Sequence, residues 1–93
     1  MEVRITSRHS TLPESLRDRT EESLSKLNKY GAHISAVEVI FDEEKNSKKI
    51  EGILHIDGRD PIVAVGAGHD FNEALGQVND RLKRQLRKLQ EQV

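Results

Sequence analysis

The chain has 93 residues, a length typical of one domain, and it carries 15 lysines and arginines against 16 aspartates and glutamates, for a formal net charge of −1. Aromatic residues make up 3% of the sequence, which disfavours a site built on aromatic stacking, and the absence of cysteine excludes disulfides, cysteine-ligated zinc and a thiol nucleophile. No apolar run approaches the roughly 18 residues of a membrane helix and no signal-peptide apolar region is apparent, so we expect a soluble, cytoplasmic protein.

The first third of the chain predicts a strand and then a helix. Apolar and polar side chains alternate over about 2–8, which is typical of a short strand with one buried face. Pro13 suits the first turn of a helix, and Ser10 or Thr11 can cap its start. Apolar residues then recur every three or four positions, so we expect the helix to run to about Lys29.

The middle of the chain predicts three strands joined by turns. Alternation over 34–42 indicates the first of them, and the polar stretch 42–49 is expected to form a hairpin loop. A second alternating segment covers 50–57, and the turn formers of 57–61 lead to a further strand at 62–67. These three strands are expected to form a meander.

A long helix over about 70–91 completes the predicted fold. Asp70 followed by Glu73 is a capping-box arrangement, and one apolar row then steps by three or four residues through Phe71, Leu75, Val78, Leu82, Leu86 and Leu89. The element order β-α-β-β-β-α predicts an α+β fold in which two helices pack on one face of a four-stranded sheet. A right-handed crossover is expected if the first two strands are parallel.

Five cations and no acid fall within one eight-residue stretch near the end of this last helix. Such charges have two interpretations. Cations late in a helix interact favourably with its dipole and keep the surface soluble. Lysine and arginine side chains on one face can also neutralise successive phosphates of a nucleic acid. Helical spacing places the five on two flanks of the apolar row, with Arg81, Arg84 and Lys88 on one and Lys83 and Arg87 on the other.

The predicted first helix contributes further cations. Arg19 and Lys26 are seven residues apart and therefore lie on one side of it, whereas Glu21 and Glu22 weaken a cationic surface there. The charges alone thus leave both a solvated face and a phosphate-binding surface open.

The sequence carries no signature of catalysis. The four histidines fall in different predicted elements and lack metal-ligand spacing, so we expect no metal. Gly66 and Gly68 precede a helix, but the residues of a phosphate or dinucleotide loop do not follow, and we expect these glycines to let the chain turn from strand into helix. No serine lies in a nucleophile-elbow context, so neither an enzyme activity nor a cofactor is expected.

The last helix resembles that of a known family. Asp70-Phe-Asn-Glu-Ala-Leu75 followed by Arg81-Leu-Lys-Arg-Gln-Leu-Arg-Lys-Leu89 is similar to the final helix of the ribosome hibernation-promoting factors, also described as ribosome-associated translation inhibitors, ribosomal subunit interface proteins or sigma-54 modulation proteins. Val3-Arg-Ile-Thr6, Leu24-Ser-Lys-Leu-Asn-Lys-Tyr30 and Val63-Ala-Val65 also resemble the family, in the same element order.

This resemblance implies a fold similar to a double-stranded RNA-binding domain. It also implies binding to ribosomal RNA of the small ribosomal subunit, in the channel used by messenger and transfer RNA. There the protein would inhibit translation by occupancy, as in ribosome hibernation under stress or in stationary phase. The implied RNA contacts are Lys26, Arg81, Lys83, Arg84, Arg87 and Lys88.

The resemblance also bears on domain organisation and partners. Residues 1–93 are expected to form a single ribosome-binding domain, a short form without the C-terminal dimerisation domain of long members. We expect a monomer away from the ribosome, with no membrane partner and no small-molecule substrate.

Three residues depart from the family pattern. Ser23 stands where members commonly carry lysine, Asn72 where tyrosine is usual, and Gly76 where aspartate is usual. Two alternatives therefore stay open. One is a diverged paralogue with weakened ribosome binding, and the other is a non-enzymatic protein-interaction module that docks through an edge strand or the acidic loop.

Overall fold

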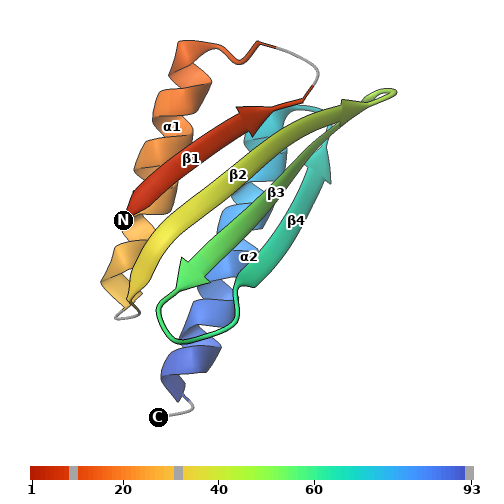
Figure 1. Ribbon diagram of the computed structural model, residues 1–93. Helices are drawn as coiled ribbons and strands as arrows, with labels where there is room; N and C mark the ends of the chain where they lie inside the picture. Colours follow the sequence, from red (N-terminus) through yellow and green to blue (C-terminus); the bar gives the residue numbers. More distant parts are fainter. Residues whose placement is uncertain (9–10, 31–32, 92–93) are drawn as a thin grey trace.

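The structure, a computed structural model, describes residues 1–8, 11–30 and 33–91, and Figure 1 shows the arrangement of its elements. The predicted β-α-β-β-β-α order is confirmed, with a short 3-10 segment (η1) added after the first helix. The elements are β1 (Glu2–Ser7), α1 (Glu14–Ser25), η1 (Lys26–Tyr30), β2 (Ile34–Glu44), β3 (Ser47–Ile56), β4 (Ile62–Gly68) and α2 (Phe71–Glu91).

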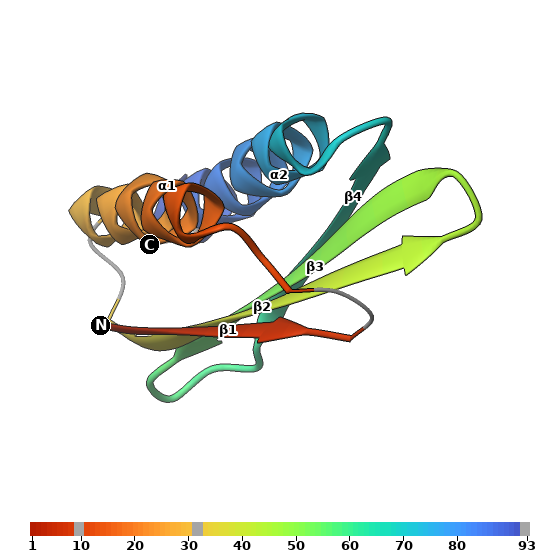
Figure 2. The same ribbon diagram turned by 90° about the horizontal axis from the view of Figure 1, so that it is seen from above.

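The four strands form one sheet in the order β1-β2-β3-β4. β1 lies parallel to β2, so the connection through α1 is a crossover, whereas β2, β3 and β4 form the predicted antiparallel meander. Both helices lie on the same face of the sheet, as Figure 2 shows, and they contact each other. The helices therefore leave the opposite face of the sheet uncovered. β1 and β4 are the two edge strands of the sheet.

The core lies between the helices and the sheet. Alternation along β2 directs Val37, Val39 and Phe41 towards the helices, and all three are buried. The rings of Phe41 and Phe71 meet edge to face, with centroids 5.1 Å apart, where the start of α2 meets the sheet. Within the predicted apolar row of α2, Leu75, Val78, Leu82 and Leu86 are buried, and Phe71 and Leu89 pack against the core at its two ends.

The predicted hairpin loop over 42–49 is wrong, because β2 and β3 continue almost to the tip. Asp42 faces Lys49 and Glu43 faces Lys48 across the ladder, and only Lys45 and Asn46 remain between the paired strands. Opposite charges on facing strands stabilise the pairing, so the polar stretch that resembled a loop extends the hairpin instead.

The start and end of α1 also differ from expectation. The helix ends at Ser25, and the residues up to Tyr30 continue as the 3-10 segment. Pro13 occupies the N-cap position, where no side-chain cap hydrogen bond forms among the described residues, so the predicted cap from Thr11 is wrong. The alternative cap, Ser10, lies outside the described residues.

Gly66 and Gly68 have a different role from the predicted one. Both lie within β4, and among the described residues a positive φ at glycine occurs at Gly58 alone. A Cβ on Gly66 would lie 2.4 Å from the carbonyl oxygen of Ala74, and one on Gly68 would lie 2.6 Å from the Glu73 carboxylate. Glycine at 66 therefore permits α2 to approach β4 closely, whereas the group near Gly68 is the end of a flexible side chain that can move away. Neither residue has the positive φ that a glycine-dependent turn from strand into helix would use.

Candidate nucleic-acid interface

A groove between α1 and α2 gathers four cationic side chains. It is lined by Arg19 of α1, Lys26 and Lys29 of η1 and Lys83 of α2, together with Glu22, Ser23 and Asn79. The spacing of the first three explains their convergence: Arg19 and Lys26 are two helical turns apart, and side chains three residues apart eclipse each other in a 3-10 segment. With four cations against one carboxylate, the groove favours an anionic ligand.

The groove unites only part of the predicted site. Lys26 and Lys83, which are distant in the sequence, line it together, whereas Arg81 lies on the other flank of α2 and donates a hydrogen bond to the carbonyl oxygen of Val65. Arg84 and Lys88 are exposed and do not line the groove. The two basic flanks predicted for α2 thus face different surroundings, one towards α1 and the other towards β4.

Arg87, another predicted contact, does not line the groove, although it shares a flank of α2 with Lys83. Its guanidinium group stacks over the ring of Tyr30 at 5.7 Å from the centroid, and the Lys29 ammonium lies 5.5 Å from the same centroid. Gln90 donates a hydrogen bond to the Tyr30 carbonyl oxygen. These contacts attach η1 to the last turns of α2 and so hold the two walls of the groove together.

The opposite end of the helix pair is held by a hydrogen bond. Arg19 Nη1 donates to Asn72 Oδ1 over 2.8 Å, which joins the middle of α1 to the first turn of α2. Asn72 is one of the departures from the family pattern, and here its side chain orients a cation that also lines the groove. A second departure, Ser23, also lines the groove, where it supplies a neutral side chain.

Sequence reasoning placed Arg19 beside Lys26 but left both Arg19 and Lys29 out of the predicted site. The signal was present in their spacing, since Arg19, Lys26 and Lys29 recur at seven and three residues. What the spacing did not reveal is which side of α1 faces α2, because that depends on how the two helices pack together.

The wall of the groove contains an unsatisfied polar atom. Asn79 Oδ1 is buried and has no hydrogen-bond partner among the described residues. Within the part of the chain that the structure describes, this is the one buried side-chain oxygen or nitrogen without a partner, and Asn79 lines the cationic groove.

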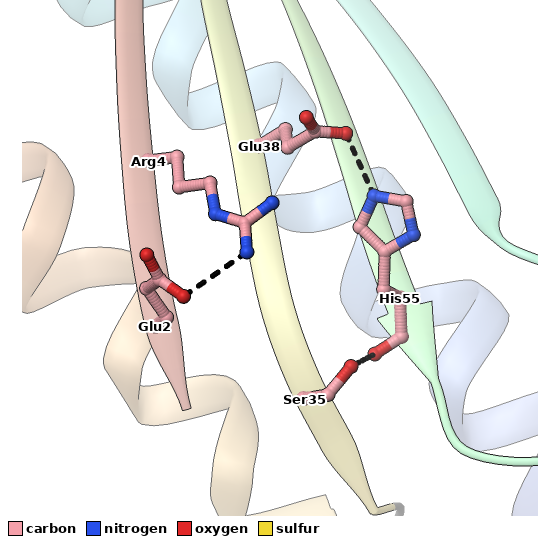
Figure 3. A network of polar contacts seen from close by, with 5 residues as sticks. All are labelled: Glu2, Arg4, Ser35, Glu38 and His55. Atoms are coloured by element: carbon pink, nitrogen blue, oxygen red, sulfur yellow. Dashed lines mark hydrogen bonds and ion pairs between the residues drawn. The ribbon is translucent and has the colours of Figure 1, made fainter.

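The uncovered face of the sheet carries mixed charges instead. Figure 3 shows Arg4 paired with Glu2 at 3.1 Å and His55 Nε2 against Glu38 Oε2 at 2.7 Å, while Ser35 Oγ donates to the His55 carbonyl oxygen. The Arg4 guanidinium lowers the pKa of the Glu2 carboxyl below its usual value, first through their hydrogen bond and then through its charge. Because carboxylates accompany each basic group, this face attracts phosphate less than the groove does.

The described residues can be compared with the requirements of a metal site and of a membrane-spanning helix. Among them, no group of three or more histidine, aspartate or glutamate side chains is placed to hold a metal ion, and His33, His55 and His69 lie far apart in the chain order. His9 lies outside the described residues. Within the same ranges, neither helix is long and apolar enough to span a lipid bilayer.

Comparison with known proteins gives consistent results. The family model described as "Sigma 54 modulation protein / S30EA ribosomal protein" matches residues 3–93. The ribosome hibernation promoting factor of Azotobacter vinelandii is 36% identical over 91 residues, which cover 98% of this chain and 84% of that protein. The factor of the same name from Pseudomonas putida is 34% identical over 91 residues, covering 98% of this chain and 88% of that protein.

Two solved structures share the fold. A ribosomal subunit interface protein from Coxiella burnetii superposes with a TM-score of 0.86 at 22% identity, covering 98% of this chain and 99% of that one. The N-terminal domain of Protein Y from Thermus thermophilus superposes with a TM-score of 0.85 at 19% identity, covering 96% and 99%. These likenesses extend over the sheet and both helices.

Proposed function

Because this chain belongs to the sigma 54 modulation protein / S30EA ribosomal protein family, we propose that it associates with ribosomes and inhibits translation. The family predicted from the last helix is confirmed, and relatives that match nearly the whole chain are named ribosome hibernation promoting factors. The single observation that supports a mechanism is the groove between α1 and α2, with its four converging cations.

The ligand of the groove is ribosomal RNA in this proposal. Folded RNA presents closely spaced phosphates, and lysine and arginine side chains that neutralise them release counterions and gain affinity without any chemical step. The site we propose is the channel for messenger and transfer RNA on the small subunit, in the cytoplasm. Binding there blocks translation by occupancy, with no catalysis, metal or cofactor involved.

The proposed RNA surface extends from the groove over the exposed side of α2. Lys26 and Lys83 lie at its centre with Arg19 and Lys29, and Arg84 and Lys88 continue it on the solvent side of the helix. Arg81 and Arg87 lie at its margins, where each also has a partner within the protein.

A pair of charge reversals tests this proposal. Lys26→Glu with Lys83→Glu replaces two facing cations of the groove, and we expect the affinity for purified small ribosomal subunits to fall more than tenfold. Arg17→Glu with Arg59→Glu is the matched control, because it changes the net charge equally at exposed positions outside the groove. Affinity is measured by sedimentation through sucrose at low salt, and folding by circular dichroism.

The comparison between the two variants decides the outcome. If both lose affinity equally, binding depends on overall charge and the groove has no special role. If neither loses affinity, a surface other than this one meets the ribosome.

A further inference from the structure

The outer edge of β4 is occupied by side chains of α2. β4 is an edge of the sheet, so one side of it pairs with β3 and the other has no neighbouring strand among the residues that the structure describes. On this outer side, the backbone of Ala67 exchanges two hydrogen bonds with Gln77: the Ala67 N–H donates to Oε1 over 3.0 Å, and Nε2 donates to the Ala67 carbonyl over 2.9 Å. A single side-chain amide thus reproduces the pair of bonds that a partner strand would make.

Two further side chains continue this pattern along the edge. Arg81 donates to the Val65 carbonyl oxygen, and Gln85 Nε2 donates to the Val63 carbonyl oxygen over 3.1 Å. The three α2 residues are spaced by four, so they form one row on the helix, and the three β4 residues are spaced by two, so their backbone groups face outward together. The row of Gln77, Arg81 and Gln85 is named the edge row below.

β4 itself has no residue that would discourage pairing with another strand. Its sequence, Ile-Val-Ala-Val-Gly-Ala-Gly, contains neither a charge nor a proline, and Val63 and Val65 are 46% and 36% exposed. Exposed apolar edge strands are templates for intermolecular pairing, and proteins usually protect them with charges, proline or a covering segment. Here protection comes from the helix beside the strand.

We propose that the edge row keeps the protein monomeric by occupying the surface through which β4 would pair with β4 of a second copy. An antiparallel pair around Val65 would be two-fold symmetric, with Val65 facing Val65 and Val63 facing Ala67. Because β4 carries no charge, two copies would meet there without repulsion between strands. The uncharged, self-complementary edge is what makes a second copy the fitting partner.

Arg81 and Gln85 thus have a role apart from RNA. Both belong to the motif by which the last helix resembles its family, yet their side chains end on the strand backbone. Gln77 makes the only bidentate contact of the row. The edge row acts in the free protein, independently of ribosome binding.

The test removes the edge row and measures the molecular mass. Gln77→Ala, Arg81→Ala and Gln85→Ala are combined, and light scattering coupled to size-exclusion chromatography follows the mass from micromolar to millimolar protein. We expect a concentration-dependent dimer for the triple variant and a monomer for the unsubstituted protein. Arg84→Ala with Lys88→Ala is the matched control, because it shortens two long side chains of the same helix and leaves the edge row intact; it is expected to stay monomeric.

A second substitution identifies the surface that pairs. Val65→Pro removes an outward-facing N–H without removing a bond to β3, so adding it to the triple variant should restore the monomer. A folded triple variant that stays monomeric at millimolar concentration overturns the proposal, and so does a dimer that persists with Val65→Pro.

Hydrogen exchange on a single variant measures the closure of the β4 edge without requiring the triple variant to fold. In the single variant Gln77→Ala, the amide of Ala67 should exchange at least tenfold faster, while amides of β3 that pair with β2 keep their rates. Unchanged protection at Ala67 would show that Gln77 does not close the edge in solution.

Discussion

Gly76 and Gly66 show how the same residue type has opposite effects at two positions. Gly76 lies on the exposed side of α2, and a Cβ added there would meet nothing within 4 Å. Glycine inside a helix costs about 1 kcal/mol relative to alanine, so this departure from the family pattern lowers stability without a packing reason. At Gly66 the missing Cβ is instead required by the carbonyl of Ala74.

Gly76→Ala should therefore raise the free energy of unfolding by roughly 0.5–1 kcal/mol. Gly66→Ala should instead lower the free energy of unfolding by about 1–3 kcal/mol, because α2 must move away from β4 to admit the methyl group. Urea denaturation followed by circular dichroism measures both. Equal effects at the two positions would contradict the close approach of helix and strand at Gly66.

Lys45 carries the one positive φ among the described non-glycine residues, 54°, at the tip of the β2-β3 hairpin. This conformation costs an ordinary residue roughly 1–2 kcal/mol, and glycine relieves it at the expense of a more flexible unfolded chain. Lys45→Gly should raise the free energy of unfolding by up to about 1 kcal/mol. Asn46→Gly, where φ is not positive, should give no such gain in the same urea titration.

At the scale of elements, α2 combines three functions on three sides. Its apolar row packs on the sheet, the edge row covers β4, and the remaining surface carries the cations proposed to meet RNA. Of the three acids of the helix, Glu73 and Asp80 precede the cations of 81–88 and Glu91 follows them, so residues 81–88 carry cations alone. The half that is proposed to bind RNA is therefore the C-terminal one.

The salt dependence of binding measures how many of these cations meet phosphates. Each phosphate contact contributes roughly −0.7 to the slope of log binding constant against log salt concentration. With about four to six contacts, we expect an overall slope of about −3 to −4. Arg84→Gln with Lys88→Gln should make this slope shallower by about 1.4. Glu73→Gln with Asp80→Gln is the control and should not make the slope shallower, since it removes acids and leaves every proposed phosphate contact in place.

On the scale of the whole molecule, shape and charge together provide the proposed mechanism. The radius of gyration is 13.0 Å and the principal extents are 42 × 20 × 18 Å, so the protein is elongated along the helices and strands. A body of this size obstructs a channel that accommodates RNA when it binds inside it. Inhibition by such obstruction requires one molecule for each ribosome.

Added protein should accordingly lower initiation in a purified translation system in proportion to its ratio to ribosomes. Raising initiator transfer RNA and initiation factors should relieve this inhibition, because the proposed site lies in the channel that transfer RNA uses. Inhibition at amounts far below the ribosome concentration, or cleaved ribosomal RNA after incubation, would reveal a catalytic activity instead.

The sequence by itself determined the element order, the buried face of each element and the family. These properties are local: the alternation of β1 to β4 and the three-to-four spacing from Phe71 to Leu89 state which side of each element is apolar, and burial of that side follows from the hydrophobic effect. The concentration of cations in 81–88 can likewise be read from the sequence alone.

Only the tertiary structure decided which charges act together. Lys26 and Lys83 share a groove because α1 and α2 pack side by side on one face, and Arg81 is drawn to β4 because α2 crosses close to that edge. Tertiary structure also decided the conformation of residues 42–49, because pairing between β2 and β3 makes most of this polar stretch part of the two strands. Local periodicity reports on one element at a time, whereas these juxtapositions depend on how separate elements pack, and that is set by many weak contacts between residues far apart in the chain.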